Sequence, residues 1–176
     1  SVGVDAWGCD YALLDERGGL VEQPYHYRDH RTDAAMASAF ARVSRDEIYR
    51  TTGIQFLPFN TLFQLHAART QQPDLFDRAA ALATIPDLMH YWLTGRIACE
   101  YTNATTTQCV DATTRTWATS LLDRMDLPSP ESIGREAGER TRVKFRLTQR
   151  GLTIAIVVLT IVVVVIGISL AATSLP

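Results

Sequence analysis

One segment near the end of the chain restricts its possible folds more than any other. Residues 152–172 are 21 residues without a charged side chain, rich in Val, Ile and Leu. As a helix, such a run spans roughly 30 Å, the thickness of a bilayer's hydrocarbon core. A buried strand or core helix is the alternative, but globular strands rarely exceed ~10 residues and soluble helices normally carry a polar face. The sequence therefore predicts a transmembrane helix and short tail over residues 151–176.

Charge on one side of this segment predicts its orientation. Five basic residues precede it, and no charged residue follows it: Arg140, Arg142, Lys144, Arg146 and Arg150. Basic residues beside a membrane-spanning helix stay on the cytoplasmic side. We therefore expect a single-pass membrane protein with residues 1–150 in the cytoplasm and residues 152–172 in contact with a lipid bilayer. The polar stretch 129–150 is predicted to be a linker.

The rest of the chain is mildly acidic. All 19 Asp and Glu residues lie before the basic flank, whereas five of the 17 Lys and Arg residues belong to that flank. This distribution argues against nucleic acid as a partner. The three cysteines are odd in number and lack C-x-x-C spacing, so neither a disulfide framework nor a zinc site is expected. No metal-ligating motif is present, and we assign no metal-binding residue.

Alternating and apolar runs predict short strands first and helices after them. Strands are expected over residues 1–5, 9–16, 97–101 and 108–112, and a polar loop over residues 24–32. Six helices are expected: around Met36–Val43, from Ser44 to Gly53, after Asn60, from Asp74, from Pro86 to Gly95 and over Leu121–Met125. Asn60 is expected to cap the helix that follows it. In the helix from Pro86 to Gly95, we expect Leu88, Trp92 and Leu93 to face inward. This order is typical of an α/β or α+β fold.

The segment Trp7-Gly8-Cys9-Asp10 is the first candidate binding site. A glycine between two extended runs lets a ligand or another backbone approach closely. A Trp face beside a carboxylate can cover the apolar side of a sugar while the carboxylate accepts hydroxyl hydrogen bonds. The alternative is a core Trp at a bulge with an Asp capping a turn, and the tetrapeptide alone favours that alternative.

Two further segments combine aromatic, charged and amide side chains. Residues 27–33 alternate Arg with Asp, which by itself is usual for a solvated ion-pair network. Residues 55–60 place two aromatic and two amide side chains around Pro58, which by itself is more often hydrophobic packing with a helix cap.

Taken together, these segments resemble the FGGY family of carbohydrate kinases, and within it the rhamnulokinases. Five blocks carry the resemblance in the same order: GVDAWGCDYALLD at 3–15, YRDHRTD at 27–33, IYRTTGIQFLPFNTLFQL at 48–65, PDLMHYWLTG at 86–95 and EYTNATTTQ at 100–108. The resemblance covers residues 1–128. It departs from the pattern at Ala6 and Cys9, where the family usually has Thr or Ser and Val.

The resemblance implies a partial ribonuclease-H-like α/β domain of the actin and hexokinase type. It also implies a kinase that phosphorylates the ketose L-rhamnulose with MgATP during rhamnose breakdown. By similarity Gly8 touches the sugar with Trp7 and Asp10 beside it, and further contacts are Arg28, Gln55 and Phe59.

Parts of the family pattern have no match in these 176 residues. They are the phosphate-binding hairpin, the segment with the Asp that acts as general base, and the nucleotide domain. We therefore assign no catalytic and no cofactor-binding residue, and expect MgATP to bind poorly. Three interpretations follow: an inactive fragment of a carbohydrate kinase, a membrane-anchored, non-catalytic sugar-binding module, or an intact enzyme whose remaining parts come from another chain.

Overall fold

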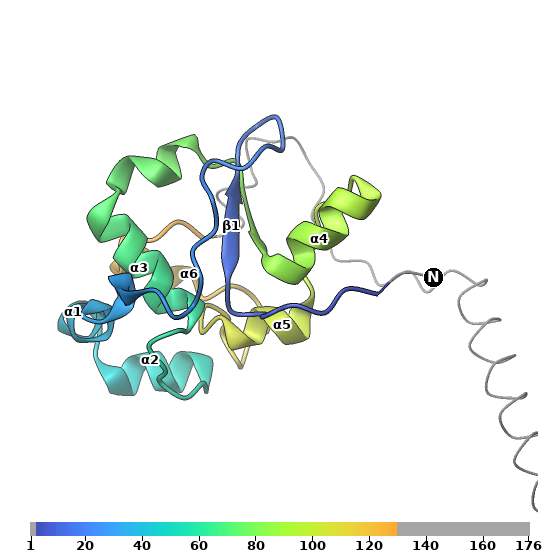
Figure 1. Ribbon diagram of the computed structural model, residues 1–176. Helices are drawn as coiled ribbons and strands as arrows, with labels where there is room; N and C mark the ends of the chain where they lie inside the picture. Colours follow the sequence, from blue (N-terminus) through green and yellow to red (C-terminus); the bar gives the residue numbers. More distant parts are fainter. Residues whose placement is uncertain (1–2, 130–176) are drawn as a thin grey trace, which may run out of the picture. The chain divides into compact units, whose positions relative to one another are not determined.

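The computed structural model describes residues 3–129, in which helices pack on both sides of a short strand pair (Figure 1). The strands are β1 (Tyr11–Leu14) and β2 (Ala81–Thr84). The helices are α1 (Ala35–Arg42), α2 (Arg45–Thr52), α3 (Thr61–Gln71), α4 (Ile85–Thr94), α5 (Tyr101–Thr106) and α6 (Thr119–Arg124), with 3-10 turns η1 (His30–Thr32) and η2 (Pro73–Arg78).

The strand pair separates two hydrophobic clusters. β1 and β2 are antiparallel, with Tyr11 opposite Thr84. Successive side chains of a strand point to opposite faces. Accordingly Tyr11 and Leu13 enter the larger cluster, which is built with α1, α3 and α6, while Ala12 and Leu14 enter the smaller one, which is built with α4. Both faces of β1 are therefore buried.

Helix α3 lies at the centre of the larger cluster. All eight residues from Thr61 to Ala68 are buried, and Phe63 is fully enclosed. Three of these buried side chains, Thr61, Gln64 and His66, are polar. Buried polar groups need hydrogen-bond partners, so α3 ties its neighbours together by polar contacts as well as by packing.

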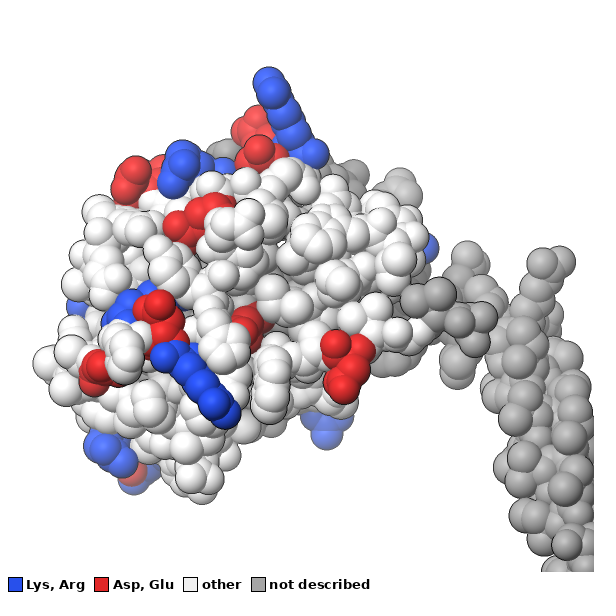
Figure 2. Space-filling view, viewed as in Figure 1, with Lys and Arg blue, Asp and Glu red and all other residues white. Residues whose placement is uncertain are grey.

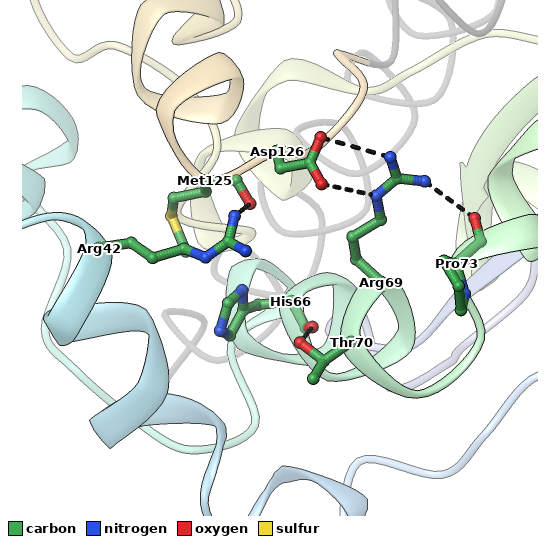
Figure 3. Close-up of polar contacts among 7 residues, drawn as sticks. All are labelled: Arg42, His66, Arg69, Thr70, Pro73, Met125 and Asp126. Atoms are coloured by element: carbon green, nitrogen blue, oxygen red, sulfur yellow. Dashed lines mark hydrogen bonds and ion pairs between the residues drawn. The ribbon is translucent and has the colours of Figure 1, made fainter.

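The end of α6 is tied to α1 and α3 by two arginines (Figure 3). Arg42 donates from Nη1 to the Met125 carbonyl at 3.1 Å. Arg69 donates two hydrogen bonds to the Asp126 carboxylate, from Nε at 3.1 Å and from Nη2 at 3.3 Å. Its Nη1 donates to the Pro73 carbonyl at 2.8 Å. The contacts with Met125 and Asp126 join segments that are distant in sequence.

Several expected helices and caps are confirmed. Ser44 caps α2 by accepting the Glu47 N–H, and α2 ends at Gly53 with φ 67°. Helix α4 carries Pro86 in its first turn and ends at Gly95 with φ 69°. The expected loop and the helices near Met36 and Leu121 are also present. The caps, the first-turn proline and the terminal glycines act on residues close to them in the sequence, so the sequence alone predicts them.

Other expectations about secondary structure were wrong. Of the four expected strands, the one over residues 9–16 is β1, shortened to Tyr11–Leu14, and the described residues of 1–5 and all of 97–101 are not strands. Residues 108–112 form only an isolated bridge, between Val110 and Trp117. A strand needs a hydrogen-bonded neighbour, and the described sheet has two strands only. Glu100 instead caps α5 by accepting the N–H groups of Thr102 and Asn103. The segment expected to be a helix from Asp74 is the 3-10 turn η2.

The inward face of α4 is also shorter than predicted. Leu88 is 2% exposed, but Trp92 and Leu93 are 55% and 62% exposed. The smaller cluster ends at Tyr91, so the last turn of α4 extends past the groups it could bury against.

The predicted transmembrane segment 152–172 and nearly all of the predicted linker lie outside the described residues. Between residues 3 and 129, no helix combines the length and the apolar character needed to cross a bilayer.

Candidate functional site

The candidate site is built around residues 7–10, which lead into β1. The Cys9 carbonyl accepts two hydrogen bonds at 2.9 Å, one from Thr61 Oγ1 and one from Gln64 Nε2. Both donors belong to the buried first turns of α3, and Gln64 also donates to the Phe59 carbonyl at 2.8 Å. Helix α3 therefore fixes residue 9 and residue 59 relative to each other.

Gly8 packs directly against the side chain of Asn103 in α5. A Cβ atom at residue 8 would stand 2.3 Å from Asn103 Oδ1. Asn103 is in turn held by Thr84, because its Nδ2 donates to Thr84 Oγ1 at 2.8 Å. The close approach explains why glycine occupies this position, and it involves the protein's own atoms.

Three aromatic rings from separate segments lie beside this loop, and we call them the aromatic platform: Trp7, Tyr27 and Phe59. The ring centroids of Trp7 and Tyr27 are 5.2 Å apart, and those of Tyr27 and Phe59 are 5.7 Å apart. Trp7 is 65% exposed, so its face is open to solvent. Exposed aromatic faces of this kind can cover the apolar C–H surface of a sugar.

Arg28 adds a cation to the edge of the platform. Its guanidinium lies 5.2 Å from the Tyr27 ring centroid, and Nε donates to Tyr27 Oη at 2.9 Å. The side chain is exposed, so its remaining N–H groups are available to an oxygen-rich ligand.

Asp10, the last residue of this loop, is buried, with 7% of its surface exposed. Burial raises the pKa of Asp10, while nearby His26 and hydrogen bonds from its neighbours oppose that shift. The Cys9 thiol lies 3.8 Å from Asp10 Oδ1, and burial raises the pKa of this thiol to about 11. The thiol therefore stays protonated at neutral pH and is a poor nucleophile.

Gln55 differs from the other predicted contacts. Its side chain is exposed and donates no hydrogen bond to the platform within residues 3–129, whereas its carbonyl accepts from Asn60 Nδ2 at 2.8 Å. Asn60 Nδ2 also donates to Gln108 Oε1 at 2.8 Å. Asn60 was expected to cap α3 with its side chain, but that side chain is used here to hold the turn that carries Phe59.

The structure thus gathers Trp7, Gly8, Asp10, Arg28 and Phe59 in one region. It also shows partners that were not singled out as site residues: Tyr27, Thr61, Gln64, Thr84 and Asn103. All of them except Thr84 lie within the sequence blocks already noted, but nothing in the local pattern indicates which side chains they contact.

Charged side chains do not mark a second site on the face drawn in Figure 2. Figure 2 shows acidic and basic side chains scattered over the visible face without a broad cluster of either sign. Within residues 3–129 no group of three His, Cys, Asp or Glu side chains is placed to hold a metal ion.

Comparisons with known proteins identify the family. The profile of the FGGY family of carbohydrate kinases, N-terminal domain, matches residues 1–133. The rhamnulokinase of Pectobacterium atrosepticum is 54% identical over 128 residues, and that of Mannheimia succiniciproducens is 50% identical over 129 residues. These matches cover 73% of this chain but 26% and 27% of the relatives. The chain thus spans about a quarter of the length of the curated relatives it matches.

Solved structures share the fold at lower identity. The gluconate kinase of Lactobacillus acidophilus superposes with a TM-score of 0.61 at 20% identity, covering 75% of this chain and 30% of that protein. The xylulose kinase of Rhodospirillum rubrum has a TM-score of 0.61 at 21% identity, covering 68% and 25%. The described part therefore has the α/β fold found in these sugar kinases, as the sequence predicted. From the family profile and the two rhamnulokinases, we conclude that this chain belongs to the FGGY family of carbohydrate kinases.

Proposed function

We propose that residues 1–128 are the ketose-binding part of a rhamnulokinase-type carbohydrate kinase. The substrate class is a ketose such as L-rhamnulose, which the whole enzyme would phosphorylate with MgATP in rhamnose breakdown. One observation supports this proposal most. The aromatic platform, Gly8 and the buried Asp10 lie together in a chain about 50% identical to rhamnulokinases.

Each group has a simple physical role in this proposal. The Trp7 face covers the apolar C–H side of the sugar, and Arg28 donates to sugar oxygens. The sugar lies beside the Gly8 backbone, where the missing side chain leaves room for Asn103, while α3 holds the loop in place through the Cys9 carbonyl. These contacts bind and orient the ketose.

We propose that these 176 residues by themselves do not transfer a phosphoryl group. Phosphoryl transfer depends on positioning and on stabilising charge on the phosphates and metal. The family's phosphate-binding hairpin has no match in these residues. The sequence also has no match to the family's general-base segment. We expect no ADP release above buffer in a coupled assay with ATP and L-rhamnulose, and measurable turnover by this chain alone would disprove the proposal.

Sugar binding is tested by removing the exposed face of the platform. We expect Trp7→Ala to weaken L-rhamnulose binding roughly threefold to tenfold, measured by NMR titration of the full chain. Trp92→Ala is the matched control, because Trp92 is also exposed but belongs to the last turn of α4. Equal binding by the parent and Trp7→Ala would place the sugar elsewhere.

We also propose that the chain is a single-pass membrane protein with residues 1–150 on the cytoplasmic side. The uncharged run 152–172 and its one-sided basic flank support this proposal. If the sugar site persists, the chain would then be a membrane-anchored binding module.

A further inference from the structure

The oxygen of the Asn103 side chain occupies the space above Gly8. It lies 2.3 Å from the position that a Cβ of residue 8 would take. A ligand that reaches Gly8 from this side therefore contacts both the glycine and Asn103 Oδ1. The contact joins α5 to the loop that carries Trp7.

A chain of hydrogen bonds determines which end of the Asn103 amide faces Gly8. Asp87 accepts the Glu100 N–H at Oδ1 at 3.2 Å and the Thr84 hydroxyl at Oδ2 at 2.7 Å. A threonine hydroxyl has a single proton, so Thr84 Oγ1 can only accept from Asn103. The donor Nδ2 must then point at Thr84, at 2.8 Å, and the acceptor Oδ1 must point at Gly8.

This arrangement leaves an acceptor with unused capacity. Within residues 3–129 no protein group donates to Asn103 Oδ1, and this atom is not among the fully buried side-chain atoms without a partner, so a ligand can reach it. Thr84 and Asp87, which hold the amide, are 1% and 6% exposed. The oxygen is thus fixed in orientation before any ligand arrives, which lowers the entropy cost of binding.

We propose that Asn103 determines specificity at the sugar site, with Oδ1 accepting a hydrogen bond from a ligand hydroxyl next to Gly8. This inference rests on the proposed ketose-binding function. A fixed acceptor favours a ligand that carries a hydroxyl at this point over an analogue without it. The analogue would displace water from Asn103 Oδ1 and donate no hydrogen bond in its place. Thr84 acts as a positioning residue that keeps the oxygen facing the ligand.

The test uses the full chain in mild detergent and follows an L-rhamnulose titration by NMR, with sucrose as a control solute. In the parent, the sugar should shift the Asn103 side-chain amide signal together with the backbone signals of residues 7–10. Asn103→Ala should weaken binding roughly threefold to tenfold. Thr84→Val should weaken it by about threefold, although Thr84 does not touch the ligand.

Thr105→Val is the matched control, because its hydroxyl bonds only to the Thr102 carbonyl on the same helix, and its binding should equal that of the parent. The parent signals do not depend on how the variants fold. Sugar-induced shifts at residues 7–10, with an unmoved Asn103 amide and unchanged binding by Asn103→Ala, would overturn this inference and leave the proposed function standing. No shift in the parent at any sugar concentration would overturn both.

Discussion

At the scale of single residues, Gly8 is under a packing constraint that involves no ligand. A methyl group at residue 8 would overlap Asn103 Oδ1. We therefore expect Gly8→Ala to lower the free energy of unfolding by about 1–3 kcal/mol, the usual cost of overpacking. Urea unfolding of the full chain measures the change.

The clash with Asn103 can be isolated by a double-mutant cycle. Asn103→Ala should relieve most of the effect of Gly8→Ala, so the double variant is more stable than the sum of the single changes predicts. Gly3→Ala is the control, because a Cβ there meets no atom within 4 Å. Additive effects of the two changes would show that Gly8 is required for another reason.

His66 is a second residue whose surroundings predict a measurable effect. Its ring is buried in α3, its Nε2 is 3.0 Å from Ser38 Oγ, and it lies near the Arg42 guanidinium (Figure 3). Burial, followed by the charge of Arg42, lowers the pKa of His66 below its usual 6.5. The folded chain therefore favours the neutral ring.

The sign of the resulting pH dependence follows from linkage. The unfolded chain protonates His66 near pH 6.5, whereas the folded chain resists protonation until a lower pH. The contribution of His66 to stability is complete above pH 6.5 and decreases as the pH falls towards the folded pKa. Chemical unfolding at pH 7.5 and 5.5 should show a larger loss for the parent than for His66→Gln. Equal losses would mean that the pKa of His66 is the same in the folded and the unfolded chain.

At the scale of elements, the stability of helix α2 depends on the residues that cap its two ends. Its polar sequence buries only Ile48 and Thr52, so packing contributes little. The Ser44 hydroxyl accepts the Glu47 N–H at 3.3 Å, and Gly53 closes the helix with φ 67°. We expect Ser44→Ala to cost about 1 kcal/mol of stability, measured by thermal or urea unfolding. Ser44→Asp keeps an acceptor and should cost much less stability. Equal losses for the two changes would show that the side-chain cap does not stabilise the chain.

Elements also differ in how well the sequence predicted them. Helices α2 and α4 were predicted with their ends because Ser44, Gly53, Pro86 and Gly95 act on neighbouring peptide groups. The strands expected over residues 1–5 and 97–101 were not found over the described part of those ranges. Strand formation depends on a partner elsewhere in the chain, and local alternation cannot supply that information.

At the scale of the whole molecule, the membrane proposal makes the broadest prediction. The run 152–172 has no charge, and Leu, Ile and Val each favour insertion by a few tenths of a kcal/mol. The full chain should remain with membranes through carbonate extraction, and a version that ends at Arg150 should not. Val163→Arg should weaken anchoring, since a central Arg costs about 2.5–3.5 kcal/mol. Recovery of the full chain in the soluble fraction would disprove the proposal.

The sequence by itself determined the family, the capped helices and the segments that make up the candidate site. These depend on the order of residues along the chain and on contacts within about one helical turn. It could not show that Trp7, Tyr27 and Phe59 form one platform, or that Trp92 and Leu93 remain exposed.

Only the tertiary structure decided what stands next to Gly8. The loop of residues 7–10 meets α3 through the Cys9 carbonyl and meets α5 through Asn103, and both helices are distant from it in sequence. The orientation of the Asn103 amide depends in turn on Thr84 and Asp87. A hydrogen bond requires its donor and acceptor within about 3 Å, and only the packing of the two hydrophobic clusters around β1 brings these groups that close.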